Sequence, residues 1–446
     1  MTCSLKIVKV NRNMGMDYPE SAAWDLNINP FKRDFPLLEN NPEIAFLDSA
    51  ATSQRPACVL DAQRSFYETM NSNPLRGLYR LSVEATEAID ETRAKVAHFI
   101  GAPAAKEIVF TRNASESLNI LARQLGEMLL KPGDEVCISI MEHHSNLIPW
   151  QQICARTGAT LVYLRTGDDA KISQQEIEEK IGPKTKIVSV AHVSNVLGVE
   201  NDIPAIARRA HEMGALCLVD GAQSAPHIRV NVAELGCDAF VFSGHKLFAP
   251  MGVGVLWAHA DLLEKMPPFL TGGEMIEWVS ETEATWAELP HKFEAGTQDA
   301  GGIVGLGTAI DYIEGIGHEL LEARERALVA ECTRRLQELP FIRLIGPERP
   351  EDHIGVVSFN VCGVHPHDVA SILDGFNVCI RAGHHCAQPL LSWMKISSCC
   401  RASVALYNDA TDIDRLVEAL NQAWTLFNPG ASAGAIAGGR RSYEKR

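Results

Sequence analysis

The feature that most constrains the fold is a regular alternation of short apolar runs with amphipathic stretches. Six runs have the length and composition of buried strands: EIVF (107–110), DEVCIS (134–139), ATLVYL (159–164), KIVSVAHV (186–193), ALCLVD (215–220) and AFVFSG (239–244). Helical patterns lie between them, as at 114–130 and 203–213. Strands separated by helices predict a mostly parallel α/β sheet with crossover helices.

A second pattern follows the glycine-rich stretch AGTQDAGGIVGLG (295–307). A long helical stretch runs to about Leu339, and it is followed by the run IGVVSFNV, a helix from about His367, the run FNVCI and a helix over 411–427. Because 446 residues exceed the size of a single core, we expect two folded domains. The predicted division is an N-terminal extension (1–25), a large domain (26–305) whose first residues could instead pack with the small domain, a small α+β domain (306–427) and a flexible tail (428–446).

Composition excludes several classes of partner. The chain has 41 Lys and Arg against 56 Asp and Glu, a formal charge of −15, which argues against general affinity for nucleic acid or anionic membranes. No segment approaches the 18 or so apolar residues of a membrane span, and the only apolar run near the N-terminus contains two lysines. The 12 cysteines are scattered along the chain without a secretion signal before them. We therefore expect a soluble, cytoplasmic protein.

Two of the predicted strands end in polar clusters. LVDGAQS contains Asp220 and Gln223, and VFSGHK contains Ser243, His245 and Lys246. Ligands of an open parallel sheet bind beyond the carboxyl ends of its strands, so both clusters can face one pocket. Alone, Asp220 is typical of a helix cap and Lys246 of a solvated turn. Together they match a carbonyl cofactor, which needs a lysine to hold it and a buried carboxylate to stabilise a protonated pyridine nitrogen.

Two further motifs have polar residues in unusual places. TRNASESLN places Asn113, Ala114 and Ser115 at a predicted helix start, where free N–H groups favour an anion, although an ordinary helix cap needs the same residues. RAGHHCAQ places Cys386 in a setting too polar for a packing residue. A free thiol has a pKa of about 8.5, so a nucleophilic role would need help from Arg381, His384 and His385.

Several motifs resemble the class V aminotransferase-type fold: MEHHSNLIPWQ, HVSNVLG, DGAQ, SGHKLFAPMGVGVL, FEAGT, and RAGHHCA followed by CCRASVALYN. Within that fold they are most similar to the SufS-type (group II) cysteine desulfurases, in the same order from about Phe35 to Leu426. The resemblance implies a PLP-dependent transferase fold, aspartate aminotransferase-like, with a mostly parallel seven-stranded sheet in the large domain and a smaller α+β C-terminal domain.

The resemblance also implies pyridoxal 5′-phosphate as the cofactor. Its catalytic residues would be Lys246, which holds the cofactor, Cys386 and His143, which stacks on the ring. Asp220 would contact the pyridine nitrogen and Gln223 the ring hydroxyl. The implied phosphate contacts are Ala114, Ser115, Ser243, His245 and Thr297, the last reaching the phosphate of a partner subunit near Gly272 and Gly273, which implies a homodimer. The implied substrate contacts are Arg401, Asn195, Arg381 and Ala50, with Asn195 also near the cofactor, and no metal ligand is implied.

The implied activity is conversion of L-cysteine to L-alanine, with a persulfide formed on Cys386. Because the segment around Cys386 is short, the sulfur is expected to pass to a docked acceptor, a small protein of the SufE or SufU kind that serves iron–sulfur cluster assembly. The alternatives are a selenocysteine lyase and a kynureninase-like enzyme, epimerase or aminotransferase of the same fold. A zinc-binding structural module is the non-enzyme alternative, suggested by the clustered side chains of Cys379, His384, His385, Cys386, Cys399 and Cys400.

The sequence departs from the family pattern at three places. Leu75 and Tyr79 stand where the family usually has histidines around its Arg-Gly pair. Gln298 and Asp299 replace Pro-Asn, and Thr271 replaces a glycine. None of these changes removes a catalytic group, so their effect is expected on substrate preference, partner docking and the dimer contact.

Overall fold

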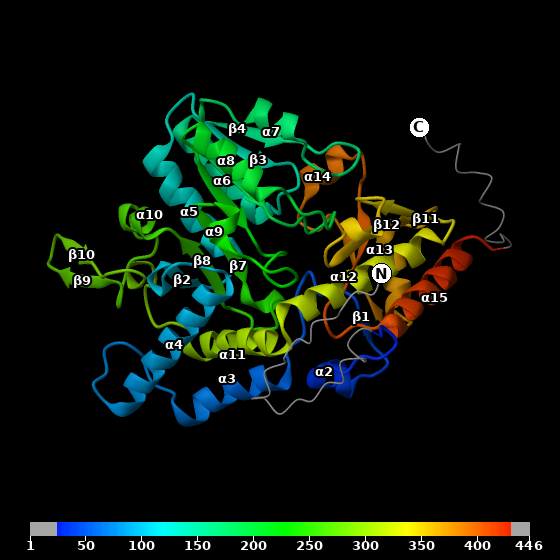
Figure 1. Cartoon of the computed structure of the whole chain (residues 1–446), viewed down its shortest axis with the longest axis horizontal. Helices are drawn as coiled ribbons and strands as arrows, with labels where there is room; N and C mark the ends of the chain where they lie inside the picture. Colours follow the sequence, from blue (N-terminus) through cyan, green and yellow to red (C-terminus); the bar gives the residue numbers. More distant parts are fainter. Residues whose placement is uncertain (1–24, 430–446) are drawn as a thin grey trace, which may run out of the picture.

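The computed structural model describes residues 25–429, so the predicted extension (1–25) and tail (428–446) lie almost wholly outside the described residues. The main element is a seven-stranded sheet. Its strands are β2 (Ile108–Thr111), β3 (Glu135–Ser139), β4 (Thr160–Leu164), β5 (Thr185–Ala191), β6 (Leu216–Asp220), β7 (Ala239–Ser243) and β8 (Gly254–Ala258), in the order β2-β8-β7-β6-β5-β3-β4 (Figure 1). In this sheet only β8 runs antiparallel to its neighbours, which confirms the predicted fold class.

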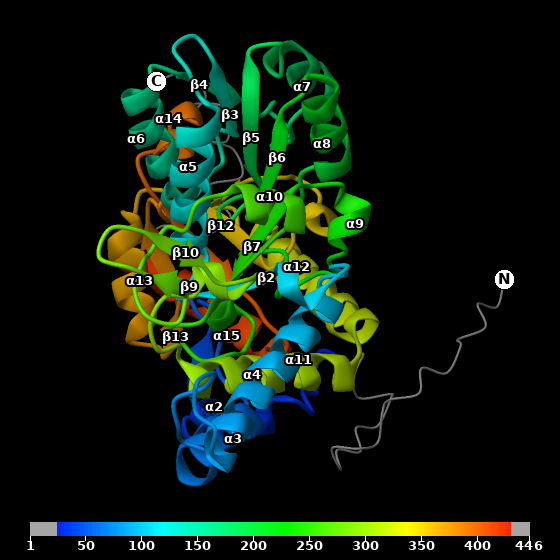
Figure 2. The ribbon, with the colours of Figure 1, turned by 90° about the vertical axis from the view of Figure 1, so that its left-hand side faces the viewer.

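Helices cover both faces of this sheet. They are α3 (Ala57–Thr69), α4 (Arg80–Phe99), α5 (Ala114–Leu129), α6 (Ile148–Thr157), α7 (Gln174–Lys180), α8 (Ile203–Glu212), α9 (Val232–Leu235), α10 (Ala260–Lys265) and α11 (Ala300–Ile316), with 3-10 turns η3 (Ala105–Glu107) and η6 (His291–Phe293). Side chains alternate along each strand, so Phe240 and Phe242 enter one core while Val241 enters the other. Helices α5 and α6 pack on the second face, and α7 and α8 on the first (Figure 2).

All six strands named from apolar runs are present, whereas β8 was missed. Its run begins with Gly254, and a glycine lowers the propensity of a strand. A Cβ on Gly254 would lie 2.4 Å from the Cα of Asn113, so the backbone of β8 can approach the start of α5 only without a side chain there. The same glycine that obscured the strand therefore allows close packing beside the predicted anion site.

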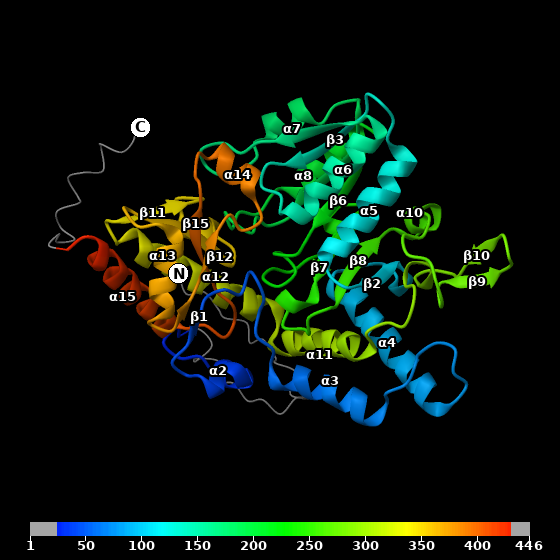
Figure 3. The same cartoon turned by 180° about the vertical axis from the view of Figure 1, so that it is seen from behind.

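The C-terminal part contains a four-stranded antiparallel sheet, ordered β11-β12-β15-β14 (Figure 3). Its strands are β11 (Ile342–Ile345), β12 (Val356–Val361), β14 (Arg381–Gly383) and β15 (Cys399–Ser403). The helices are α12 (His318–Gln337), α13 (Pro366–Asp374), α14 (Gln388–Trp393) and α15 (Ala410–Phe427), with the 3-10 turn η7 (Pro350–Asp352). The long predicted helix is broken at Gly317, whose φ of 94° ends α11 and precedes α12.

The first described residues pack against this C-terminal part. They form the turn η2 (Lys32–Asp34), α2 (Pro36–Asn40) and β1 (Ala45–Phe46), and β1 pairs in parallel with β13 (Val378–Cys379). The Asn29 side chain donates hydrogen bonds to the carbonyls of Leu406 and Asn408. The predicted division at residue 306 stays a prediction, and it falls inside α11, which packs on α3 and α4.

A hairpin of β9 (Ile276–Val279) and β10 (Ala284–Trp286) projects from the body of the protein, at the far end from α15 (Figure 1). Trp278 and Val279 are 54% and 56% exposed. Large exposed apolar side chains on a projecting element are typical of an interaction surface. Within residues 25–429, no helix has both the length and the apolar character needed to cross a bilayer.

Candidate active site

A cavity of about 260 Å³ lies where β3, β5, β6 and β7 end. All of the predicted site residues except Thr297 line it, namely Ala50, Ala114, Ser115, His143, Asn195, Asp220, Gln223, Ser243, His245, Lys246, Arg381, Cys386 and Arg401. Thr297 lines a separate cavity of about 560 Å³. Asn113, which caps α5, lines both cavities.

Lys246 is placed in the cavity by η5 (Gly244–Lys246), the turn that directly follows β7. Among the described residues its Nζ has no hydrogen-bond partner. Burial lowers the pKa of Lys246 to about 8, and the nearby carboxylate of Asp220 opposes this shift. A neutral amine is a base and a nucleophile, so this lysine can act as either at a pH where most lysines are charged.

Asp220 ends β6 and is 5% exposed. Its Oδ1 accepts a hydrogen bond of 2.9 Å from the Ala222 N–H, while Oδ2 accepts none from the described part of the chain. Burial raises the pKa of Asp220, and the Ala222 N–H and Lys246 oppose that shift. Gln223 Nε2 donates to the Ala50 carbonyl at 2.9 Å, which brings the N-terminal segment to the cavity wall.

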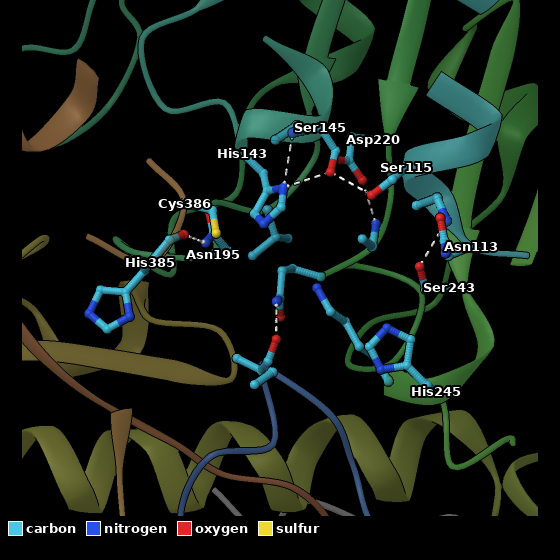
Figure 4. Close-up of a pocket in the computed structure, with 18 of the residues that line it drawn as sticks. Asn113, Ser115, His143, Ser145, Asn195, Asp220, Ser243, His245, His385 and Cys386 are labelled. Carbon is cyan, nitrogen blue, oxygen red and sulfur yellow. Dashed lines mark hydrogen bonds between the residues drawn. The ribbon is translucent and has the colours of Figure 1, made fainter. Parts of the chain in front are cut away.

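The start of α5 presents polar groups to the cavity. Asn113 caps the helix by accepting the Glu116 N–H, and the Ala114 N–H donates to Ser243 Oγ at 2.9 Å. Ser115 Oγ lies 2.6 Å from Ser145 Oγ (Figure 4). The N–H groups in the first turn of a helix have no intrahelical acceptor, so this corner is suited to an anion. Ser145 was not predicted as a site residue, because its only signal was its position two residues after His143.

His143 and His245 are the aromatic rings of the site. His143 Nδ1 accepts the Ser145 N–H at 3.1 Å, and burial, assisted by the charge of Lys246, lowers the pKa of His143 to about 3. His245 Nδ1 lies 3.2 Å from Thr52 Oγ1, and burial lowers the pKa of His245 to about 4. Both rings are therefore neutral near pH 7, and an uncharged ring can stack on a planar ligand without a desolvation penalty for a charge.

The Cys386 segment connects β14 to α14. His385 and Cys386 have φ values of 50° and 54°, which non-glycine residues rarely adopt. The Asn195 side chain donates to the His385 carbonyl at 2.8 Å (Figure 4), and the His144 N–H donates to the Cys386 carbonyl at 2.7 Å. Because two successive carbonyls are held in this way, the exposed Cys386 thiol is kept at the cavity.

His385 does not assist the thiol as the sequence suggested. Its imidazole turns away, and Nε2 lies 3.0 Å from the carbonyl of Cys399. Burial, followed by the charge of Arg401, lowers the pKa of His385 to about 3, so it brings no positive charge to Cys386. Among residues 25–429 no three His, Cys, Asp or Glu side chains are arranged to hold a metal ion.

Arg401 lies on β15 and is 3% exposed. Its Nη1 donates to the Asn195 carbonyl at 2.9 Å, and its Nη2 lies 3.4 Å from Asp48 Oδ1. Asp48 Oδ2 is 3.0 Å from Arg381 Nη2, so one carboxylate holds both arginines. Asp48 was missed because it lies 333 residues before Arg381 and in no polar cluster. Arg401 Nε has no hydrogen-bond partner within the described residues.

Comparison with known proteins identifies the family of this chain. The family described as aminotransferase class-V matches residues 45–416, which is most of the chain. The chain belongs to this family. A probable cysteine desulfurase from Halalkalibacterium halodurans is 46% identical over 90% of this chain and 99% of its own length.

Two solved structures extend the comparison. The class V aminotransferase fold of this chain matches an apo cysteine desulfurase from Thermococcus onnurineus with a TM-score of 0.85, at 39% identity over 93% of this chain and 99% of the other. It matches the cysteine desulfurase CsdA from Escherichia coli with a TM-score of 0.83, at 36% identity over 89% of this chain and 98% of the other. The predicted family is thus confirmed, while the group II subtype stays a prediction.

The low pKa of Lys246 leads to a pH prediction. In cofactor-free protein, reductive methylation of Lys246 should reach half its maximal rate near pH 8, because the neutral amine is the reactive form. Lys265, whose side chain is exposed, serves as the control site. Asp220→Asn should lower the midpoint for Lys246 further, since Asp220 raises that pKa. Peptide mass spectrometry across the pH range measures both sites, and a Lys246 profile that follows Lys265 would contradict the prediction.

Proposed function

We propose that this protein is a pyridoxal-phosphate-dependent cysteine desulfurase, which converts L-cysteine to L-alanine and receives the sulfur on Cys386. The observation that carries the proposal is that one cavity contains Lys246, Asp220 and Cys386, which come from separate parts of the chain. An amine of low pKa, a buried carboxylate and a thiol are the three groups that this reaction needs from a protein. Relatives and solved structures with the same printed activity support it.

The residues of the cavity fit pyridoxal phosphate. Lys246 Nζ would hold the aldehyde, and the unpartnered Asp220 Oδ2 would face the pyridine nitrogen. His143 would cover the ring, and the start of α5 with Ser243 and His245 would bind the phosphate. When bound, this cofactor supplies an electron-withdrawing ring that makes bonds at the substrate Cα and Cβ easier to break.

Arg401 is the residue we assign to the substrate carboxylate. Its planar guanidinium can meet a carboxylate through two N–H groups. Burial makes an unpaired guanidinium costly, so Asp48 and the Asn195 carbonyl hold it in place before a substrate arrives. A carboxylate substrate would therefore bind to a guanidinium that is already oriented.

In the proposed reaction, Lys246 accepts a proton from the substrate and Cys386 accepts its sulfur. Lys246 Nζ accepts the Cα proton of the substrate, which its low pKa favours. The Cys386 thiolate then attacks the substrate sulfur, so an S–S bond forms on Cys386 as the substrate C–S bond breaks, and its electrons stay with the carbon. That carbon would take up the proton that the Cys386 thiol gave up when it became a thiolate, so alanine is released and the sulfur stays on Cys386 as a persulfide. Lys246 and Cys386 line the same cavity, so both can reach one bound substrate.

Replacing Cys386 tests the activity. Cys386→Ala should lower L-alanine formation from L-cysteine by at least about 100-fold while the visible absorbance of the bound cofactor remains. Cys362→Ala, which changes another exposed cysteine, should leave the rate unchanged. In the wild type, mass spectrometry after brief exposure to L-cysteine should find one added sulfur on Cys386. Full activity of Cys386→Ala would instead favour a kynureninase-like enzyme, an epimerase or an aminotransferase, and activity kept only with selenocysteine would favour a lyase.

We also propose that the protein is a homodimer in which Thr297 serves the partner's site. Thr297 lies outside the cavity that contains Lys246 of its own chain, in a cavity that shares the lining residue Asn113 with it. The β9–β10 hairpin offers an exposed apolar surface, and Arg76, in the segment before α4, forms an ion pair with Glu274, two residues before β9. These features support a second copy as the occupant of this end of the molecule.

Charges on the hairpin test the dimer. The double variant Trp278→Glu, Val279→Glu should be a monomer in light scattering with size exclusion, because paired apolar surface would acquire unpaired charge. Leu426→Glu is the matched control, since Leu426 is also exposed but lies on α15 at the opposite end of the molecule (Figure 1). A monomeric wild type, or a double variant that stays dimeric, would contradict the proposal.

The sulfur on Cys386 would pass to a small acceptor protein of the SufE or SufU kind, in the cytosol, for iron–sulfur cluster assembly. The hydrogen bonds that hold the His385 and Cys386 carbonyls support this, because a held segment cannot carry sulfur to a distant site. The absence of disulfides among the eleven described cysteines supports a reducing compartment.

Turnover with a purified acceptor tests this step. Addition of a small acceptor with its own reactive cysteine should raise steady-state alanine formation about tenfold or more, because removal of the persulfide otherwise limits the rate. The same acceptor with that cysteine replaced by alanine is the control. Equal rates with and without the acceptor would end the proposal of a docked protein.

A further inference from the structure

The turn η4 (His144–Asn146), which follows β3, contacts the Cys386 segment at two points. The His144 N–H donates to the Cys386 carbonyl at 2.7 Å, and His144 Nε2 accepts the Gln388 N–H at 3.3 Å. One residue of this turn thus holds the chain at Cys386 and again two residues later. His144 does not line the cavity, so it contacts the nucleophile's backbone rather than the substrate or cofactor.

The backbone that His144 holds is one that needs support. His385 and Cys386 have consecutive φ values of 50° and 54°, a conformation that non-glycine residues rarely adopt. Such a conformation persists only where the surrounding contacts determine it. His144 holds the backbone at Cys386, the second residue of the strained pair, and at Gln388, while Asn195 holds the carbonyl of His385.

The turn itself is fixed by a buried network. Glu142 accepts hydrogen bonds from Ser139 Oγ, from the Ala191 N–H at 2.9 Å and from Asn146 Nδ2 at 2.6 Å. Asn146 in turn accepts from other side chains, at 2.6 Å from Ser189 Oγ and at 3.0 Å from Trp150 Nε1. Because these partners belong to β3, β5 and α6, the turn is built on rigid elements, as accurate positioning requires.

We propose that His144 is a positioning residue for Cys386, which keeps the thiol at the cavity by holding the backbone at Cys386 itself and again at Gln388. This inference rests on the proposed desulfurase function, in which Cys386 attacks the substrate sulfur. Because Gln388 donates its N–H to Nε2, the imidazole is neutral with its proton on Nδ1. Burial, followed by His384, lowers the pKa of His144, which favours that neutral form.

Three substitutions separate the two contacts. His144→Gln can keep both, because the Gln side-chain oxygen can accept from Gln388. His144→Ala loses the side-chain acceptor alone. His144→Pro loses the acceptor and the N–H, and it suits the backbone, because residue 144 begins a helical turn and His143 has φ −59° and ψ 147°. His98→Ala, which changes an exposed histidine on α4, is the matched control.

The readouts are turnover of two substrates and backbone exchange, all on the cofactor-loaded protein. With L-cysteine, kcat should be lowered least in His144→Gln, more in His144→Ala and most in His144→Pro, where the loss should be about 10- to 100-fold. With β-chloroalanine, whose chloride leaves without attack by a thiol, kcat should stay at the wild-type value. Hydrogen–deuterium exchange at 384–390 should become faster in the Ala and Pro variants alone.

Two outcomes would overturn the proposal. Equal losses with both substrates would show that His144 acts on the cofactor side of the site, through His143. If His144→Pro changes neither L-cysteine turnover nor hydrogen–deuterium exchange, the Cys386 segment is held without His144. If the wild type forms no alanine from L-cysteine, the proposed function fails instead, and the exchange measurement still decides whether His144 holds the Cys386 segment.

Discussion

The electrostatic influence of two buried groups, Lys246 and Asp220, on each other is the constraint on which the rest of the site depends. Burial disfavours the charged form of each group, and each charge reduces that penalty for the other. The pair exists because β6 and β7 are parallel neighbours whose carboxyl ends meet at one edge of the sheet. The fold therefore determines the chemistry of the lysine, since an exposed lysine in the same turn would remain charged at neutral pH.

The C-terminal part completes the cavity through contacts between segments far apart in the chain. Asp48 bridges Arg381 and Arg401, so one carboxylate joins the N-terminal segment to β14 and β15. The backbone bridge between Asp48 and Ser403 reinforces this junction. A buried arginine held in this way keeps its orientation without a ligand, and the energetic penalty of its burial is met before a substrate binds.

The sequence predicted the parts of the fold and site that depend on local patterns. Apolar runs indicated the central strands, and residues at strand ends, such as Asp220 and Lys246, indicated the cavity. Asp48 and His144 could not be predicted, because their importance comes from contacts with residues hundreds of positions away. The left-handed backbone at Cys386 was equally hidden, since a positive φ is normally signalled by glycine and here falls on a histidine and a cysteine.

The strained Cys386 segment would hold the thiol accurately at the cavity, but it would limit the distance over which that thiol can deliver sulfur. A thiol on a long loop could deliver sulfur over a distance, but it would spend much of its time away from the substrate. Here two carbonyls are held, and the thiol stays beside Lys246 and the anion-binding start of α5. The geometry that would favour attack on the substrate would therefore also confine a sulfur bound to Cys386, in keeping with the proposal of an acceptor that comes to the cavity.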